Sequence, residues 1–448
     1  MLKKVLIANR GEIALRIIRA CKEMNINTVA VYSEADKEAL HVKLADEAYC
    51  IGPAQATKSY LNEKNILEVA VLSEADSIHP GFGFLAENSR FAKMCEECNL
   101  KFIGPSYKTI ELMGNKINSK KLMSDNSVPV IEGSKGKITS FKDAKEQATK
   151  IGYPVILKAS AGGGGKGIRI VFNEEELKEM LDLVKQEARN CFNDDTIYME
   201  KYIQNPRHVE IQILSDKYNN CVYLGERDCS VQRNNQKIIE ESPSTILNDS
   251  LRRKMGKAAV RAAKAASYEG AGTVEFLVDK DNNYYFMEMN TRIQVEHPVT
   301  EMMTGIDIVK QQLKIASGLK LDLSQEEIIS KGHSIECRIN AENPYKNFIP
   351  SPGKIEKLML PGGNETRVDT AVYEGYEIPT FYDSMIAKVI VHAKNRNDAI
   401  AKMNRALSEC KIEGVDTNIN FLKEILNNCK FKSGKFTTAL IKEEFNLW

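Results

Sequence analysis

The beginning of the sequence alternates short apolar stretches with amphipathic ones, and this alternation limits the folds that are open to the chain. Lys4 to Ala8 predicts a buried strand, Glu12 to Met24 has apolar residues at helical spacing, and Thr28 to Tyr32 predicts a second strand. Further strands are expected to end near Ser77–His79 and Lys101–Gly104. Repeated strand–helix–strand units with short connections predict a parallel sheet with helices on both faces.

Length and charge set the next limits. The chain has 448 residues, and domains hold roughly 150 residues each, so we expect two to four domains. Lys and Arg number 62 and Asp and Glu 61, a balance that offers no overall attraction to nucleic acid or to an anionic membrane. No apolar run approaches the roughly 18 residues that span a bilayer, and the apolar stretch at the amino terminus is too short for a signal peptide. We therefore expect a cytoplasmic protein with no nucleic-acid or membrane partner.

The sequence pattern changes near residue 115 and again near residue 331. Between these points short strands surround one acidic helix from Asn173 to Glu187, and a hairpin over Thr273–Asn290 is expected to turn at Asp281–Asn283. After Lys331, strands mix with Pro-Gly turns, and a helix is expected over Asp398–Glu409. We predict an α/β and α+β multidomain protein with domains at 1–114, 115–330 and 331–448.

A glycine-rich run from Lys158 to Gly167 lies between two predicted strands. A Walker loop needs Ser or Thr where Gly167 stands, and a dinucleotide motif needs a following helix where Ile168–Val171 predicts a strand. A glycine-rich hairpin remains, the arrangement that covers nucleotide phosphates in kinases, with Lys158 and Lys166 adding charge. A solvent-exposed loop without a ligand is the alternative.

Polar residues alternate with mostly apolar ones after the hairpin. In an extended segment Glu288, Asn290, Arg292, Gln294 and Glu296 share one face. Pairing about the hairpin turn is expected to bring Glu275 beside Glu288, and two facing carboxylates favour a hard cation such as Mg²⁺ between them. The alternative is an amphipathic strand with a solvated polar face.

Two other segments are polar. Ser334–Asn340 predicts a strand with Glu336, Arg338 and Asn340 on one face, which an exposed strand would also show. The segment from Glu226 to Glu241 has too many charges for a core strand, so we expect a loop or the edge of a site there.

Several short stretches carry, in the same order, the motifs of one family: Ile7–Ala14, His79–Asn88, Gly104–Ser106, Lys116, Lys158–Gly167, Arg227–Ser230, Glu288–Glu301, His333–Glu342 and Tyr382–Lys388. Across essentially its whole length the sequence resembles the biotin carboxylase component of acyl-CoA carboxylases such as acetyl-CoA carboxylase. This resemblance implies a parallel N-terminal domain, an ATP-grasp domain with a mobile glycine-rich lid at about 131–203, and a C-terminal domain.

The resemblance also implies the reaction. ATP and bicarbonate would form carboxyphosphate, and biotin would become N-carboxybiotin with release of ADP and phosphate. Mg²⁺ or Mn²⁺ is the implied metal. The reaction would be the first half of an acyl-CoA carboxylase, with acetyl-CoA and fatty-acid synthesis downstream, or alternatively that of a pyruvate or propionyl-CoA carboxylase.

Site residues follow from the same resemblance. It implies catalytic roles for Lys237, Arg292, Glu296 and Arg338, the last also contacting biotin. ATP would be bound by Lys116, Lys158, Gly163, Gly164, Gly165, Lys166, Gly167, Glu200, Lys201, Ile203, His208, Gln232, Glu275 and Glu288. The implied metal ligands are Glu275, Glu288 and Asn290, and bicarbonate would contact Lys237, Arg292, Gln294, Val295 and Glu296.

Two positions depart from the family pattern. Arg233-Asn234-Asn235 stands where Arg-Arg-His is frequent, and Phe82 stands where Tyr is frequent, so one cation, one imidazole and one hydroxyl are missing. We assign Asn235 no catalytic role.

Partners are expected as well. The sequence lacks an Ala-Met-Lys-Met biotin-attachment motif, so we expect a separate biotin carboxyl carrier protein and carboxyltransferase subunits. A homodimer is expected, with Arg19 and Glu23 resembling dimer contacts, although an ordinary surface ion pair explains them equally well.

Two other functions remain open. One is a different ATP-grasp ligase, such as a carbamoyl-phosphate or purine-pathway enzyme, because carbamoyl-phosphate enzymes also activate bicarbonate. The other is a nucleotide-binding regulatory subunit that has lost catalysis.

Overall fold

A five-stranded parallel sheet forms the N-terminal part of the computed structural model, which describes residues 1–134, 136–159, 167–192 and 195–445. Its strand order is β3-β2-β1-β4-β5, with β1 (Lys4–Ile7), β2 (Asn27–Tyr32), β3 (Glu47–Cys50), β4 (Ser77–His79) and β5 (Lys101–Phe102). The helices of this part are α1 (Gly11–Glu23), α2 (Leu40–Leu44), α3 (Glu63–Leu72), α4 (Ser89–Glu97) and α5 (Tyr107–Gly114). The predicted parallel sheet is thus confirmed.

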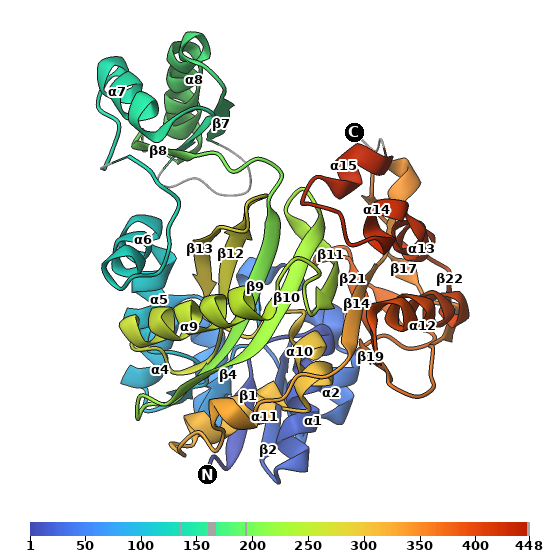
Figure 1. Cartoon of the computed structure of the whole chain (residues 1–448). Coiled ribbons are helices and arrows are strands. Elements are labelled where there is room, and N and C mark those ends of the chain that lie inside the picture. Colours follow the sequence, from blue (N-terminus) through green and yellow to red (C-terminus); the bar gives the residue numbers. More distant parts are fainter. Residues whose placement is uncertain (135, 160–166, 193–194, 446–448) are drawn as a thin grey trace.

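An eight-stranded antiparallel sheet lies at the centre of the molecule (Figure 1). Its order is β13-β12-β9-β10-β11-β14-β21-β19. The strands are β9 (Arg207–Ser215), β10 (Cys221–Arg233), β11 (Gln236–Ser242), β12 (Gly270–Val278), β13 (Tyr284–Asn290), β14 (His333–Asn340), β19 (Thr366–Thr370) and β21 (Met385–Ala393). Because β14, β21 and β19 extend β11, this sheet continues across the domain limit predicted at residues 330 and 331.

The two faces of this sheet differ in chemistry. Val209, Ile211 and Ile213 of β9 pack in one core with the alanine-rich helix α9 (Asp249–Ala265). The alternate residues His208 and Glu210 point to the opposite face, as the period of two along a strand requires. The apolar residues and the polar residues of β9 are all buried, so neither face of this strand is open to bulk solvent. Helices α6 (Lys116–Asp125), α10 (His297–Thr304) and α11 (Ile308–Ala316) complete this part.

A small three-stranded domain stands apart from the central sheet (Figure 1, top). Its order is β7-β6-β8, with β6 (Val155–Ala159), β7 (Ile168–Val171), β8 (Ile197–Lys201), α7 (Phe141–Ile151) and α8 (Glu174–Phe192). The two helices and the sheet enclose a core of their own, which includes Ala144, Leu157 and Leu181. We refer to residues 131–203 as the lid.

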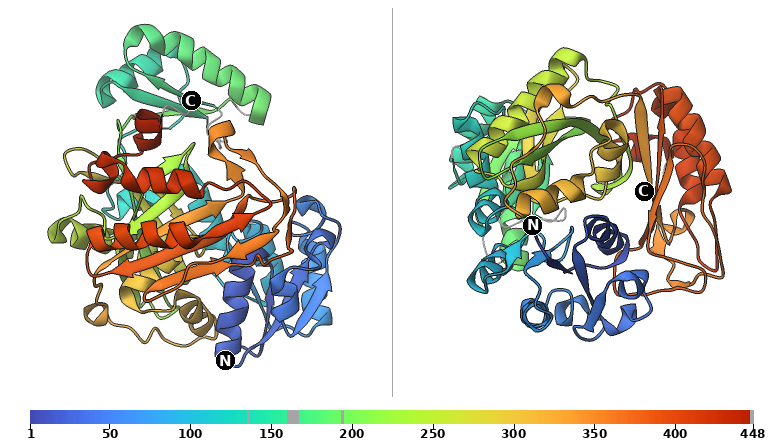
Figure 2. Two further views of the ribbon diagram at one scale, coloured as in Figure 1. Left: turned by 90° about the vertical axis from the view of Figure 1, so that its right-hand side faces the viewer. Right: turned by 90° about the horizontal axis from the view of Figure 1, so that it is seen from below.

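Helices cover the C-terminal strands on the side away from the N-terminal sheet (Figure 2). They are α12 (Arg396–Glu409), α13 (Ile419–Asn427), α14 (Cys429–Lys432) and α15 (Leu440–Phe445). Three strand pairs complete the region: β15 (Glu342–Asn343) with β16 (Ile349–Pro350), β17 (Gly353–Lys354) with β20 (Glu377–Ile378), and β18 (Lys357–Met359) with β22 (Lys411–Glu413). In the described part of the chain, no helix has the length and apolar character needed to cross a membrane.

One sequence-based prediction was wrong and another was right in part. The strand expected through Glu296 ends at Asn290, and residues 291–296 are an irregular segment before α10. The charged segment from Glu226 to Glu241 is not a loop, because most of it lies in β10 and β11 near the middle of the sheet. Its charges are tolerated there because buried partners neutralise them, as Glu210 does for Arg227. Residues 232–237 of this segment do border a cavity, as expected for the edge of a site.

Candidate functional site

A cavity of about 1240 Å³ lies between the polar face of the central sheet and the lid. Most sequence-predicted site residues line it: Lys116, Lys158, Glu200, Lys201, Ile203, His208, Gln232, Lys237, Glu275, Glu288, Asn290, Arg292, Gln294, Val295, Glu296 and Arg338. Strands of the central sheet, the turn at 291–296 and the lid therefore face the same space. Gly163, Gly164, Gly165 and Lys166 lie outside the described residues.

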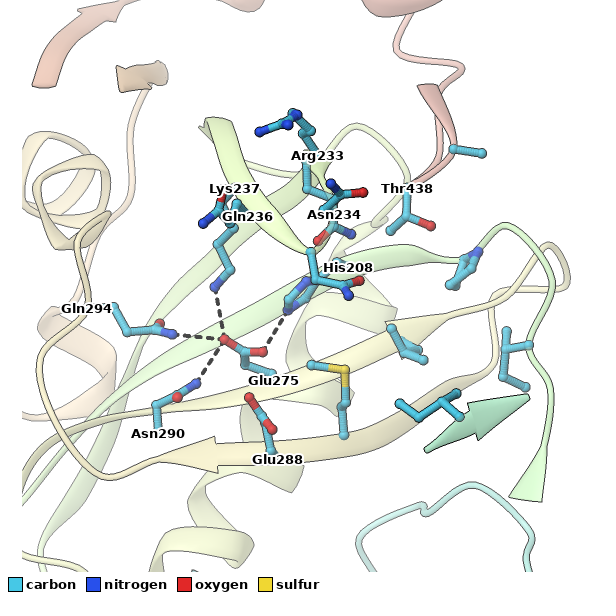
Figure 3. Close-up of a pocket in the computed structure, with 18 of the residues that line it drawn as sticks. His208, Arg233, Asn234, Gln236, Lys237, Glu275, Glu288, Asn290, Gln294 and Thr438 are labelled. Atoms are coloured by element: carbon cyan, nitrogen blue, oxygen red, sulfur yellow. Dashed lines mark hydrogen bonds and ion pairs between the residues drawn. The ribbon is translucent and has the colours of Figure 1, made fainter. Parts of the chain in front are cut away.

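Glu275 on β12 is the centre of the most densely bonded part of the cavity. Its Oε1 accepts hydrogen bonds from Lys237 at 2.9 Å, Asn290 at 2.8 Å and Gln294 at 2.8 Å. His208 Nε2 lies 2.9 Å from Oε2, and Figure 3 shows these groups converging. Burial alone would raise the pKa of Glu275, but Lys237 and His208 hold it well below its usual range. The carboxylate is therefore ionised.

Glu288 lies directly opposite Glu275, as the hairpin pairing predicted (Figure 3). Burial first, and then the charge of Glu275, raise the pKa of Glu288. Lys116 and His208 act in the opposite direction on this pKa without offsetting the burial and the charge of Glu275. Two carboxylates and the amide oxygen of Asn290 are hard ligands that suit Mg²⁺ or Mn²⁺, so the three predicted ligands fit such a metal.

A second set of possible ligands is already neutralised. One ligand atom each from His208, Glu210 and Glu275 lies within 4.8 Å of the others. However, the ammonium of Lys237 is 2.6 Å from Glu210 Oε2 and 2.9 Å from Glu275 Oε1. The ammonium of Lys237 therefore already fills the space between Glu210 and Glu275, whereas no ion pair to Glu288 is recorded among the described residues.

Glu296 precedes α10 and is 1% exposed. Its Oε1 is 2.7 Å from Nζ of Lys237, and its Oε2 is 2.9 Å from Nη2 of Arg338. Burial would raise the pKa of this carboxyl, yet Lys237, Arg338 and Arg227 together hold it well below its usual range. Glu296 is an ionised carboxylate on the cavity wall, which is the state that a general base requires.

Arg338 on β14 is held in place by a residue that the sequence did not single out. Glu240 on β11 accepts a hydrogen bond from Nε of Arg338 at 2.6 Å and forms an ion pair with Nη2 at 2.5 Å. Burial raises the pKa of Glu240 to about 7 even though Arg338 acts in the opposite direction. The guanidinium is thus bound between Glu240 and Glu296 while it lines the cavity.

Arg292 is placed differently from the rest of the predicted bicarbonate set. Its Nε donates to Glu87 at 2.8 Å, and Nη2 donates to Asn290 at 3.3 Å. Lys237, Gln294 and Glu296 are connected through Glu275 and direct bonds, whereas Arg292 reaches toward the N-terminal part. It borders the cavity without contacting Glu296 among the interactions recorded for the described residues.

A carboxylate of the lid is surrounded by cations that come from the lid and from α6. Glu200 on β8 accepts from Lys158 at 2.6 Å and also pairs with Lys120 of α6, which sequence reasoning missed. Burial and the charge of Lys116 lower the pKa of Lys158 to about 8. The pKa of Lys120 is lowered to about 7, first by burial and then by the charges of Lys158 and Lys116. Several cations forced together in a cavity attract an anion with multiple charges, such as a nucleotide phosphate chain.

The glycine hairpin is confirmed at its base. β6 and β7 are antiparallel, with Lys158 opposite Ile168. Gly167 has a φ of +70°, and its carbonyl accepts from Ala159 N at 2.9 Å. This left-handed conformation favours glycine and returns the chain into β7.

Arg227 is the main structural residue to which we assigned no role from the sequence. It is fully buried and donates to Glu210, Gln212, Thr300, Thr273 and Gln294. Its signals in the sequence were the family motif at Arg227–Ser230 and its place in a segment that we judged too polar for a core. A guanidinium can be buried when every donor has a partner, which explains why this segment forms a core strand although we judged it too charged for one.

Arg19 and Glu23, which we predicted to be dimer contacts, have different surroundings in this chain. Glu23 pairs with Lys310 of α11 at 2.6 Å, and Arg19 is exposed on the same helix as Glu23. The alternative that we gave, an ordinary ion pair between Arg19 and Glu23, is not among the ion pairs recorded for the described residues.

Taken with the paired strands that hold the carboxylates and the glycine hairpin of the lid, this site defines an ATP-grasp enzyme. Three family models cover the chain: "Biotin carboxylase, N-terminal domain" at 1–110, "Carbamoyl-phosphate synthase L chain, ATP binding domain" at 115–324, and "Biotin carboxylase C-terminal domain" at 336–443. The chain belongs to the biotin carboxylase family, and it is an ATP-dependent ligase.

Relatives match over nearly the full length. Biotin carboxylase 1 of Bacillus subtilis is 58% identical over 99% of this chain and 98% of its own length. The solved biotin carboxylase component of a pyruvate carboxylase has a TM-score of 0.88 and 53% identity over 100% of this chain and 99% of its own. The biotin carboxylase domain dimer of the 2-oxoglutarate carboxylase of Hydrogenobacter thermophilus, solved with MgADP, ADP and bicarbonate, has a TM-score of 0.93 and 53% identity over 100% and 98%.

Proposed function

We propose that this enzyme uses ATP and bicarbonate to carboxylate biotin carried on a separate protein, giving ADP, phosphate and N-carboxybiotin. The observation that carries the proposal is the ionised, buried carboxylate of Glu296, held by Lys237 and Arg338 on the wall of a cavity that Lys158 of the lid and the lysines of α6 also line. A base and an anion site in one enclosed space suit the attack of bicarbonate on a terminal phosphate.

Nucleotide binding is assigned to the lid end of the cavity. Lys116, Lys158, His208 and the glycine hairpin would contact the phosphates, and Gln232 would contact the ribose. Glu200, Lys201 and Ile203 would hold the adenine. Support comes from the position of the described members on the cavity wall. Binding of ATP would compete for Lys158, which the structure pairs with Glu200.

The metal is assigned to Glu275, Glu288 and Asn290, with Mg²⁺ or Mn²⁺ as the ion. When bound, it supplies positive charge to the phosphate groups of the nucleotide. The protein itself keeps Glu275 ionised through Lys237 and His208, and the raised pKa of Glu288 describes a carboxyl that a cation would help to ionise.

Bicarbonate is assigned to the end of the cavity around Lys237, Arg292, Gln294, the Val295 N–H and Glu296. Glu296 would remove the proton of bicarbonate, and the resulting anion would attack the γ-phosphoryl group to give carboxyphosphate. Arg292 would have to exchange its ion pair with Glu87 for the substrate, since a guanidinium is suited to a planar carboxylate-like group.

Biotin is assigned to Arg338. Breakdown of carboxyphosphate would give CO₂ and phosphate, and that phosphate would deprotonate the ureido nitrogen of biotin. The permanent charge of Arg338 would stabilise the oxyanion formed on the ureido group. The pairing of this guanidinium with Glu240 keeps it oriented along the cavity wall.

The acyl acceptor is a finer question. We propose acetyl-CoA, with the protein serving fatty-acid synthesis, and keep pyruvate or propionyl-CoA as alternatives. The relatives include components of a pyruvate carboxylase and of a 2-oxoglutarate carboxylase at similar identity, so acceptor choice would lie with a separate carboxyltransferase. A biotin carboxyl carrier protein and a second copy of this chain are the other proposed partners, the latter supported by the dimeric relative.

The test is release of ADP from ATP in the presence of bicarbonate and Mg²⁺, with and without free biotin. We expect biotin to increase the bicarbonate-dependent rate and expect ammonia to have no effect. Stimulation by ammonia in place of biotin would instead identify a carbamoyl-phosphate type of ligase. Absence of any bicarbonate-dependent turnover would favour a nucleotide-binding regulatory subunit.

A further inference from the structure

A buried lysine lies directly behind the proposed bicarbonate turn, and no role has yet been assigned to it. Lys388 on β21 is 0% exposed. It is opposite Arg338 in the β14–β21 register and opposite Asp369 in the β19–β21 register. The three residues therefore form a row across the sheet, and the lysine sits one strand beyond the arginine assigned to biotin.

The shortest contact of Lys388 is made to the main chain. Its Nζ donates to the carbonyl oxygen of Val295 at 2.7 Å. The carboxylates of Glu12 and Asp369 lie farther away, at 3.1 Å and 3.8 Å. These acids, with the buried Glu336, offset the cost of burying the ammonium. The contact to Val295 is a hydrogen bond, so it fixes the orientation of the carbonyl group that accepts it.

The preceding peptide of the turn is also held by a buried side chain. Nδ1 of His297 lies 2.8 Å from the carbonyl oxygen of Gln294. Burial, then the charges of Lys388 and Arg16, keep the pKa of His297 well below its usual range, so the ring is neutral. The two peptides that flank Val295 are thus each bound through their carbonyl oxygen to a buried side chain: His297 holds the peptide that carries the Val295 N–H, and Lys388 holds the peptide that leads to Glu296.

We propose that Lys388 is a positioning residue of the carboxylation reaction, which holds the Val295 carbonyl so that the Val295 N–H and the Glu296 carboxylate face bicarbonate. This inference rests on the proposed function. Lys388 is not among the residues that line the cavity: it acts through the main chain of the turn, and its ion pair with Glu12 connects it to helix α1 of the N-terminal part. Small displacements of a reacting group have large effects on rate, which is why a distant anchor matters.

The variants are chosen to separate position from folding. Lys388→Met alone leaves Glu12 buried without its recorded ion-pair partner, whereas Asp369 keeps its pair with Arg367 at 2.7 Å, so loss of stability is expected. The double variant Lys388→Met/Glu12→Gln removes the unpaired carboxylate charge and still lacks the donor to Val295. Glu12→Gln alone is the matched control, because Lys388 keeps its bond to Val295.

Steady-state ADP release with biotin is measured against both bicarbonate and ATP. For the double variant we expect kcat/KM for bicarbonate to fall about a hundredfold, while KM for ATP stays within roughly twofold. Glu12→Gln is expected to retain both constants. A folded double variant with unchanged bicarbonate kinetics, or with equal losses for ATP and bicarbonate, would overturn the inference.

Two further outcomes also decide the question. Failure of the double variant to fold, seen as loss of its circular dichroism and of a cooperative thermal transition, would show that Lys388 serves the fold and would overturn the assignment. Absence of bicarbonate-dependent turnover in the unmodified enzyme would overturn the proposed function first. The two failures are therefore distinguishable.

Discussion

Two carboxyl groups of this site stay ionised although burial by itself would favour their protonated, neutral form. Glu275 and Glu296 are both nearly inaccessible, yet Lys237 bonds to each of them and to Glu210. One ammonium between three carboxylates keeps the proposed base and the proposed metal ligand ionised at neutral pH. Removal of any one of these partners leaves an uncompensated charge in a medium of low dielectric constant.

The role of Glu296 is tested by Glu296→Gln, which keeps the shape of the side chain and removes the proton acceptor. We expect bicarbonate-dependent ADP release to fall by about a hundredfold or more, with ATP affinity nearly unchanged in calorimetric titration. Glu377→Gln, at an exposed carboxylate of β20, is the control. Collapse of ATP binding in Glu296→Gln would show a structural role instead.

The pKa of Lys158 in the lid predicts a pH effect on ATP binding. Burial and the charge of Lys116 lower the pKa of Lys158 to about 8, so its ammonium is present below that pH and is lost as the pH rises through it. Because phosphate binding needs the charged form, kcat/KM for ATP is expected to decline as pH increases past about 8. Lys158→Arg, which stays protonated, should flatten this alkaline limb. An identical limb in both proteins would contradict the assignment.

At the scale of elements, the hairpin of β10 and β11 shows how a charged segment becomes a central part of a sheet. Arg233 pairs with Gln236 across a two-residue turn, and Asn234 and Asn235 have φ values of 47° and 65°. Positive φ at both central residues is the conformation of a type I′ turn, which asparagine accepts. The Asn-Asn departure from the family pattern thus suits the turn that places Gln232 and Lys237 on the cavity wall.

Substitution in this turn tests that explanation. Asn235→Val places a β-branched residue at positive φ and is expected to lower the free energy of unfolding by about 1–2 kcal/mol. Asn235→Gly, which meets no such strain, should be neutral or slightly stabilising. Chemical denaturation of both variants measures the difference. Equal stability of the two would mean that the turn does not depend on the residue at this position.

At the scale of the whole molecule, one antiparallel sheet joins the predicted central and C-terminal domains. Strand β11, which precedes residue 330, pairs with strand β14, which follows it. One hydrophobic core also joins the two parts, because it contains Val231 and Ile239 together with Ile335 and Val389. Separation at this limit would expose the edge of β11 and part of that core. An exposed edge strand with an apolar face promotes association with other chains.

Fragments 1–330 and 331–448 provide the test. Each expressed alone is expected to aggregate or to lack a cooperative thermal transition, because neither completes the shared sheet. Co-expression of the two should recover a soluble complex with bicarbonate-dependent activity. A monomeric 331–448 fragment with a cooperative transition would show instead that the C-terminal part folds independently of the sheet.

Local patterns were enough to predict much of the architecture. The strand–helix alternation of the N-terminal part, the hairpin that pairs Glu275 with Glu288, and the base of the glycine hairpin all depend on residues close together in the sequence. Periods of two and 3.6 residues are local properties. The motifs that resemble the biotin carboxylase family are also short stretches, and their order along the chain identified the family.

Contacts between distant segments were not predictable in this way. Sequence patterns established the kinds of strand, the hairpins and the family, but the folded chain was needed to show which distant residues support the site. These are Glu210, Glu240, Arg227 and Lys388, together with Glu87, to which Arg292 turns. A buried charge is stable only beside its partners, and those partners come from strands that the chain brings together only when the whole sheet has formed.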